Sequence, residues 1–136
     1  MFNNLFKPID TLHKGLSASW TRNTIIRNNI ANVETPNFKA SGLEFESVLR
    51  RAFLDSGKFR ATVTHPKHIY FGPLNIDDVR PVVFQRNELS MRADGNNVDI
   101  EAENIRLAQN SIFYNTLVEK MNGEIRRLKM ASSEGR

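Results

Sequence analysis

The stretch LFKPIDTLHKGLSASWTRNTIIRNNIANV, residues 5–33, repeats apolar side chains at the spacing of a single helix face. Its apolar positions are Leu5, Ile9, Leu12, Leu16, Ile26, Ile30 and Val33. The steps alternate between four and three residues when the polar Ser19 and Asn23 are counted, a pattern typical of a helix that packs on a partner helix. We expect this helix to run from Pro8 to Val33, because proline suits a first turn and a further proline soon after residue 33 stops the helix.

The other end of the chain carries a second apolar run, at Tyr114, Leu117, Met121, Ile125 and Leu128. We expect a helix from Asp99 to Ala131, with the Asp99 side chain as its N-cap and Glu101 and Glu103 as acids of its first turn. Ile105 and Ile112 lie on a stripe offset from that run, so the helix is apolar over a broad arc. Such an arc suits contacts with more than one neighbouring helix.

The two runs predict a mainly α fold, in which long terminal helices pair as an antiparallel, coiled-coil-like domain of residues 1–33 and 98–136. Residues 34–97 would connect them and include a short helix at about 43–54. Glycine and proline interrupt the rest of this segment, where residues 61–64 and 81–85 are candidate short strands.

The net charge of +4 comes from 19 basic and 15 acidic residues and is concentrated at the ends of the chain. Residues 1–33 and residues 120–136 each carry a net charge of +3. A basic helical adaptor or a nucleic-acid-binding protein is therefore the alternative function. No dense run of Lys and Arg interleaved with aromatic residues occurs, so we expect no nucleic-acid partner.

No segment predicts a catalytic, cofactor-binding or metal-binding residue. The chain has no cysteine, which excludes thiolate chemistry and cysteine-based metal sites. His65 and His68 have no third ligand nearby in the sequence, and we expect them to be surface side chains. Residues 94–99 resemble a calcium loop but have Asp99 where glycine is required. We therefore expect no enzyme, no cofactor and no small-molecule substrate.

The sequence also predicts no membrane span, because no segment approaches the roughly 20 apolar residues that a span needs. Residues 1–8 contain no basic region followed by a continuous apolar segment. We therefore expect no cleaved secretory signal.

Two polar segments adjoin the long helices. Asn28-Asn29-Ile30-Ala31-Asn32-Val33-Glu34-Thr35-Pro36-Asn37-Phe38-Lys39 closes the first helix, and Met91-Arg92-Ala93-Asp94-Gly95-Asn96-Asn97-Val98-Asp99-Ile100-Glu101 opens the last. The first resembles the N-terminal signature of bacterial flagellar rod, hook and hook-associated proteins. The second, together with the short chain, resembles the proximal rod proteins of that group. Asn37 stands where the family often has glycine, and asparagine also tolerates a positive φ.

The residues that carry this resemblance are Asn28, Asn29, Ile30, Ala31, Asn32, Thr35, Pro36, Phe38, Asp94, Gly95, Asn96, Asn97, Val98 and Asp99. It implies a structural subunit of the flagellar basal-body rod, exported through the flagellar type III apparatus. The implied partners are further copies of the chain, other rod proteins, and basal ring and export-gate components. The implied location is the periplasm, or the cell-wall zone of a single-membrane bacterium. The apolar residues of both helical runs would then carry packing and assembly.

Overall fold

The computed structural model describes residues 6–55, 76–87 and 92–133. The chain forms two compact units, one of Met1–Leu43 with Val83–Arg136 and the other of Glu44–Val82. Both boundaries between the units fall within residues 34–97. Leu5, the candidate strand at residues 61–64 and the pair His65 and His68 lie outside the described residues.

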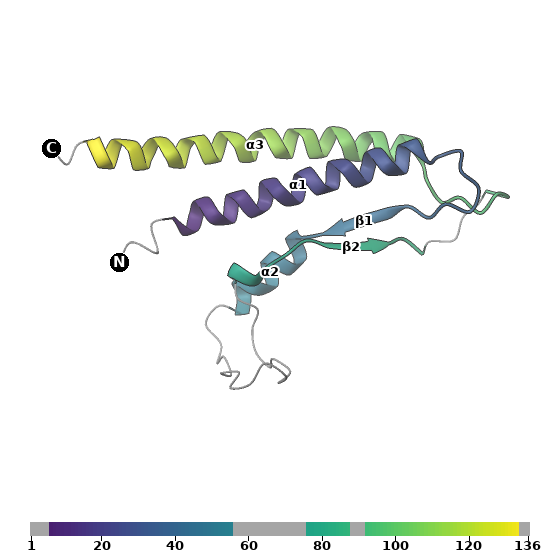
Figure 1. The fold of residues 1–136 in the computed structure, drawn as a ribbon, viewed down its shortest axis with the longest axis horizontal. Helices are drawn as coiled ribbons and strands as arrows, with labels where there is room; N and C mark the ends of the chain where they lie inside the picture. The colour runs from purple at the N-terminus through teal and green to yellow at the C-terminus, as the bar shows by residue number, and fades with distance from the viewer. Residues whose placement is uncertain (1–5, 56–75, 88–91, 134–136) are drawn as a thin grey trace. The chain divides into compact units, whose positions relative to one another are not determined.

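Two long helices dominate the first unit. Helix α1 spans Lys7–Ala31 and helix α3 spans Ile100–Ser133. Figure 1 shows them side by side and running in opposite directions. The predicted mainly α fold with two paired long helices is therefore confirmed. The predicted N-cap of α3 is also present, because Asp99 Oδ1 accepts hydrogen bonds from the backbone N–H groups of Glu101 and Ala102, at 3.0 and 3.2 Å.

Small and polar side chains fill much of the seam between α1 and α3. The buried residues of α1 are Gly15, Ala18, Ser19, Ile26 and Asn29. Gly15 faces Leu117, and a Cβ atom at Gly15 would lie 3.3 Å from Leu117 Cδ1. Glycine at this position therefore allows the two helices to approach closely.

The short helix predicted at about residues 43–54 is confirmed in the segment after α1, but it begins later than predicted. Strand β1 occupies Ser41–Glu44, and helix α2 begins only at Glu46 and ends at Asp55. Strand β2 spans Val82–Gln85, as predicted, and β1 and β2 form a two-stranded sheet (Figure 1). The Phe84 ring covers Gly42 so closely that a Cβ at Gly42 would lie 2.6 Å from Phe84 Cζ. The apolar pattern of this segment did not reveal the strand, because its partner lies about 40 residues away in the chain.

Helix α1 also ends earlier than predicted, at Ala31 rather than Val33. The backbone N–H of Asn32 still bonds to the carbonyls of Asn28 and Asn29, both at 3.2 Å, and the chain then turns. The second unit contains α2 and a 3₁₀ turn, η2, at Ile76–Asp78. Its buried side chains among the described residues include Phe45, Ala52 and Val79.

We expect Gly15→Val to lower the free energy of unfolding by about 1–3 kcal/mol, because the added side chain collides with Leu117 in a packed seam. Gly123→Val is the matched control, since a Cβ at Gly123 meets no atom within 4 Å. That control should change stability by less than about 0.5 kcal/mol, because valine and glycine differ little in helix propensity. Urea unfolding followed by circular dichroism would measure both. Equal stability of the two variants would contradict a close approach at Gly15.

Candidate functional site

The two polar segments that carry the sequence resemblance, residues 28–39 and 91–101, are called the motif segments below. They meet at one end of the helix pair, where the Asn96 side chain bonds to both. Asn96 is fully buried. Its Nδ2 group donates to the backbone carbonyls of Asn32, Val33 and Thr35, at 2.9, 3.0 and 2.9 Å. Its Oδ1 accepts from the backbone N–H of Val98 at 2.7 Å. One amide therefore satisfies the turn that follows α1 and the segment that precedes α3.

Asn97 makes the corresponding connection to the strands. Its Oδ1 accepts from the backbone N–H of Ala40 at 2.7 Å, and its Nδ2 donates to the carbonyl of Arg86 at 2.8 Å. Arg86 in turn donates its backbone N–H to the carbonyl of Ala40 at 2.8 Å. The segment before α3 is thereby fixed to the residues that precede β1 and follow β2.

Each of the two motif segments contains one residue with positive φ. Asn37 has φ 60° and Gly95 has φ 74°. The backbone N–H of Asn37 donates to the Asp94 carbonyl at 2.8 Å, and Lys39 Nζ donates to the Gly95 carbonyl at 2.6 Å. Asn37 thus adopts the positive φ that asparagine tolerates, as the sequence predicted. Gly95 has a second constraint, because a Cβ there would lie 2.8 Å from Asn37 Oδ1.

A buried carboxylate joins α1, α3 and the end of β2. Glu103 is fully buried, and its Oε1 accepts hydrogen bonds from Arg86 Nη1 at 2.7 Å and from Arg106 Nη1. Its Oε2 accepts from Asn29 Nδ2 at 3.1 Å. Asn29 also pairs with the backbone of Ser41, donating to its carbonyl at 2.9 Å and accepting from its N–H at 3.0 Å. Sequence reasoning treated Glu103 as a first-turn acid of the helix and missed this cluster.

Burial by itself raises the pKa of Glu103. The hydrogen bonds from Arg86, Asn29 and Arg106 outweigh that effect and hold the pKa below its ordinary value of 4.5. The carboxylate is therefore charged at neutral pH and balances part of the charge of two guanidinium groups. Among the described residues, every buried side-chain nitrogen and oxygen has a hydrogen-bond partner.

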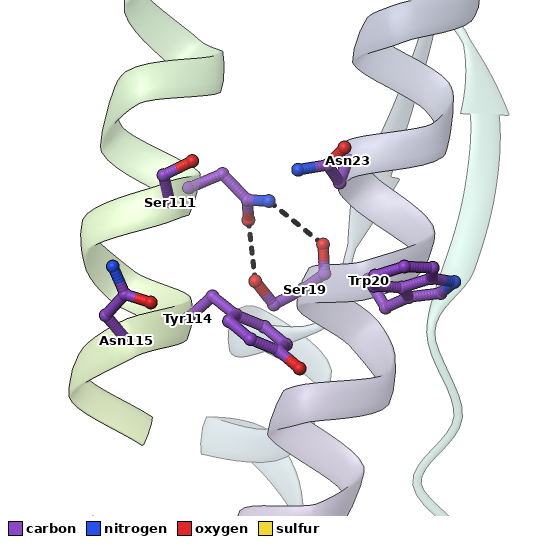
Figure 2. Close-up of a pocket in the computed structure, with 7 residues that line it drawn as sticks. Ser19, Trp20, Asn23, Ser111, Tyr114 and Asn115 are labelled. Atoms are coloured by element: carbon purple, nitrogen blue, oxygen red, sulfur yellow. Dashed lines mark hydrogen bonds between the residues drawn. The ribbon is translucent and has the colours of Figure 1, made fainter. Parts of the chain in front are cut away.

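A second polar contact lies farther along the seam. Ser19 Oγ donates to Asn110 Oδ1 at 2.9 Å, and Asn110 Nδ2 donates to the Ser19 carbonyl at 2.9 Å (Figure 2). A pocket of about 120 Å³ adjoins this pair. It is lined by Ser19, Trp20, Asn23, Asn110, Ser111, Tyr114 and Asn115. No charged side chain lines the pocket, so its surface offers hydroxyl, amide and aromatic groups only.

The structure places the predicted packing residues in three groups. Ile26 is buried in the seam. The half-buried group contains Ile9, Leu12, Leu16, Ile30, Val33, Tyr114, Leu117, Met121 and Leu128. Ile105, Ile112 and Ile125 are 60%, 69% and 49% exposed. The offset stripe of α3 therefore does not contribute to the seam with α1.

The described part of the chain shows no group of three or more His, Asp or Glu side chains that could hold a metal ion. No helix in the described ranges is both long and apolar enough to cross a membrane.

The chain matches no family model. It is similar to curated proteins of several bacteria, each named flagellar basal body rod protein FlgB. The protein of Bacillus subtilis (strain 168) is 35% identical over 128 residues, which cover 94% of this chain and 95% of the relative. That of Borreliella burgdorferi is 36% identical over 118 residues, covering 85% and 87%. That of Cereibacter sphaeroides is 32% identical over 111 residues, covering 82% of both chains.

We expect Asn96→Ala to lower the free energy of unfolding by about 2–4 kcal/mol, because three carbonyls of the turn and the buried N–H of Val98 lose a side-chain partner. The control is Asn104→Ala, which removes an exposed asparagine from α3 and should change stability by less than about 0.5 kcal/mol. Chemical unfolding of the purified variants measures both values. A stable Asn96→Ala protein would show that the turn holds without this amide.

Acid should weaken the Glu103 cluster. The folded-state pKa of Glu103 is below its ordinary value of 4.5. The stability that the ionised Glu103 contributes is therefore complete above about pH 4.5 and is lost as the pH falls through the folded-state pKa. Glu103→Gln should lower the free energy of unfolding by about 2–4 kcal/mol at pH 7, because two arginines lose their counter-charge. The stability of this variant should also change less with pH below pH 5. Glu119→Gln, at an exposed position, is the control. If Glu103→Gln lost stability below pH 5 as steeply as the natural chain, Glu103 would not be the group responsible for that loss.

Proposed function

This chain belongs to the family of the flagellar basal body rod protein FlgB, so it is a structural subunit of the flagellar basal body rod, and we propose that it polymerises with other rod proteins into the shaft that transmits torque for motility. The observation that carries this proposal is similarity over nearly the whole length of both chains. The contact between the two motif segments supports the proposal, because the residues that carry the resemblance lie together in the structure. The region that contains Asn96, Asn97 and Glu103 with their partners is called the junction below.

We propose that the outer face of α3 contacts a neighbouring subunit. Ile105 and Ile112 lie one heptad apart, so they share one face of the helix. Both are more than half exposed, whereas Leu117 and Met121 are half-buried. The residues from 107 to 118 contain no charged side chain, so covering the part of this face around Ile112 would desolvate no ion.

The contact that this face makes would be heterologous. A face of α3 that packs on a different surface of the next subunit repeats without closing, and such contacts generate helical assemblies. A helical rod needs this kind of contact along its length. The neighbours would be further copies, other rod proteins, and basal ring and export-gate components.

We propose a periplasmic location, or the cell-wall zone in a single-membrane bacterium, reached through the flagellar type III apparatus. Family membership supports this location, because the relatives are named as basal body rod proteins. The role needs packing and mechanical resistance rather than chemistry, so we propose no catalytic activity. Close-packed protein resists deformation because it is poorly compressible.

The double variant Ile105→Asp with Ile112→Asp tests the assembly face. Both side chains are exposed, so the isolated chain should keep its helical content, while rod assembly and swimming should be lost. The measurements are circular dichroism of the purified protein and swimming of a strain in which the variant replaces the natural gene. Asn104→Asp with Asn122→Asp adds the same charges at other exposed positions of α3 and should leave swimming intact. Normal swimming of the isoleucine variant would exclude this face.

A further inference from the structure

The seam between α1 and α3 has a polar contact where its apolar pattern is interrupted. Ser19 is 1% exposed and Asn110 is 4% exposed, and two hydrogen bonds of 2.9 Å join them. Figure 2 shows these two hydrogen bonds as dashed lines that end on Ser19. Two apolar side chains of similar size could fill the same space and would need no hydrogen-bond partner.

The apolar stripes alone do not define one alignment of the helices. In the structure Gly15 faces Leu117, and Ser19 faces Asn110. A shift of one heptad toward the C-terminus of α3 would again place the apolar residues of α1 that precede Ser19 opposite apolar residues of α3, since both stripes repeat with the same spacing. The stripes would also fit the corresponding helices of another copy of the chain.

The polar pair removes this ambiguity. After a shift of seven residues, Asn110 would face Leu12 or Ile26 instead of Ser19. Its buried amide would then lack a partner, and an unsatisfied buried amide is strongly disfavoured. The serine hydroxyl can bond to a carbonyl of its own helix, so most of the penalty comes from the asparagine. Asn29 and Glu103 form a second buried polar contact farther along the seam, which requires the same alignment.

We propose that the Ser19–Asn110 pair fixes the register and the partner of α1, so that α1 pairs with α3 of its own chain and not with a helix of a neighbouring copy. A buried asparagine is known to fix register and partner in coiled coils. The proposal rests on the proposed function only in naming neighbouring copies as the competing partners. A rod subunit assembles among many chains that present the same apolar stripes, so a pairing choice of this kind prevents exchange of helices between subunits.

The chain contains no cysteine, so introduced cysteines report which residues meet. Gly15→Cys with Leu117→Cys reports the native register, because these positions already face each other. Gly15→Cys with Glu124→Cys reports a shift of one heptad, in a chain that also carries Leu117→Ala to make room for the side chain added at Gly15. A mixture of two chains, one with Gly15→Cys and Leu117→Ala and the other with Leu117→Cys and a size tag, reports pairing of α1 with α3 of another chain as a disulfide-linked dimer of the two different chains. Each reporter is placed in the full-length protein, and disulfides formed under mild oxidation are separated by non-reducing electrophoresis.

The test variant is Ser19→Ala with Asn110→Leu, which replaces both polar groups by apolar ones. With the natural pair present, the shifted and interchain disulfides should be roughly tenfold or more rarer than the native one, as expected for an unsatisfied buried amide. In the test variant they should rise roughly threefold or more, while the Asn29–Glu103 contact and the Asn96 hydrogen bonds still favour the native alignment and the thermal midpoint stays equal or increases. Ser17→Ala with Asn115→Leu makes the same substitutions at exposed positions and should keep the native pattern.

Asn110→Leu alone is a second variant, because it keeps Ser19 and removes only the amide that a shift would leave unpaired. It should show the same increase in the shifted and interchain disulfides. The native disulfide pattern in either variant would overturn the proposal. Loss of helical structure in both variants would overturn it too, because the pair would then be needed for folding and not for the choice of partner. Neither result depends on swimming, so the inference and the proposed rod function can fail separately.

Discussion

The structure depends on the need to satisfy backbone groups where the chain reverses between its long helices. The turn after α1 leaves the carbonyls of Asn32, Val33 and Thr35 without helical partners, and the Asn96 amide bonds to all three. Because the same side chain also accepts from the N–H of Val98, the direction of α3 is fixed relative to the end of α1. The seam, the strands and the outer face of α3 all follow from this arrangement.

The long helices could be predicted because their apolar spacing is local information. The predicted ends of α3 differ from the observed ones by at most two residues, and α1 ends two residues earlier than predicted. Strand β1 could not be predicted, since its apolar residues fit a helix and its structure depends on pairing with β2. Gly42 was also uninformative in the sequence, although the Phe84 ring packs against it.

The candidate site was predicted in its segments but not in its contacts. The resemblance identified residues 28–39 and 94–99 as important, yet it did not show that Asn96 reaches the turn after α1. Glu103 looked like an ordinary first-turn acid, because its partners Asn29 and Arg86 are 74 and 17 residues away in the chain. Ser19 looked like an interruption of the stripe for the same reason, since Asn110 lies 91 residues away.

The junction is built mainly from amides. Asn96 and Asn97 carry no charge, so their hydrogen bonds do not titrate, and dissolved ions screen them far less than they screen ion pairs. Acid can discharge Glu103, which pairs with two arginines, and Asp94, which pairs with Arg92 and accepts from the backbone N–H of Asn96. A change of ionic strength or a mild change of acidity should therefore leave the turn in place, where a junction made only of surface ion pairs would loosen.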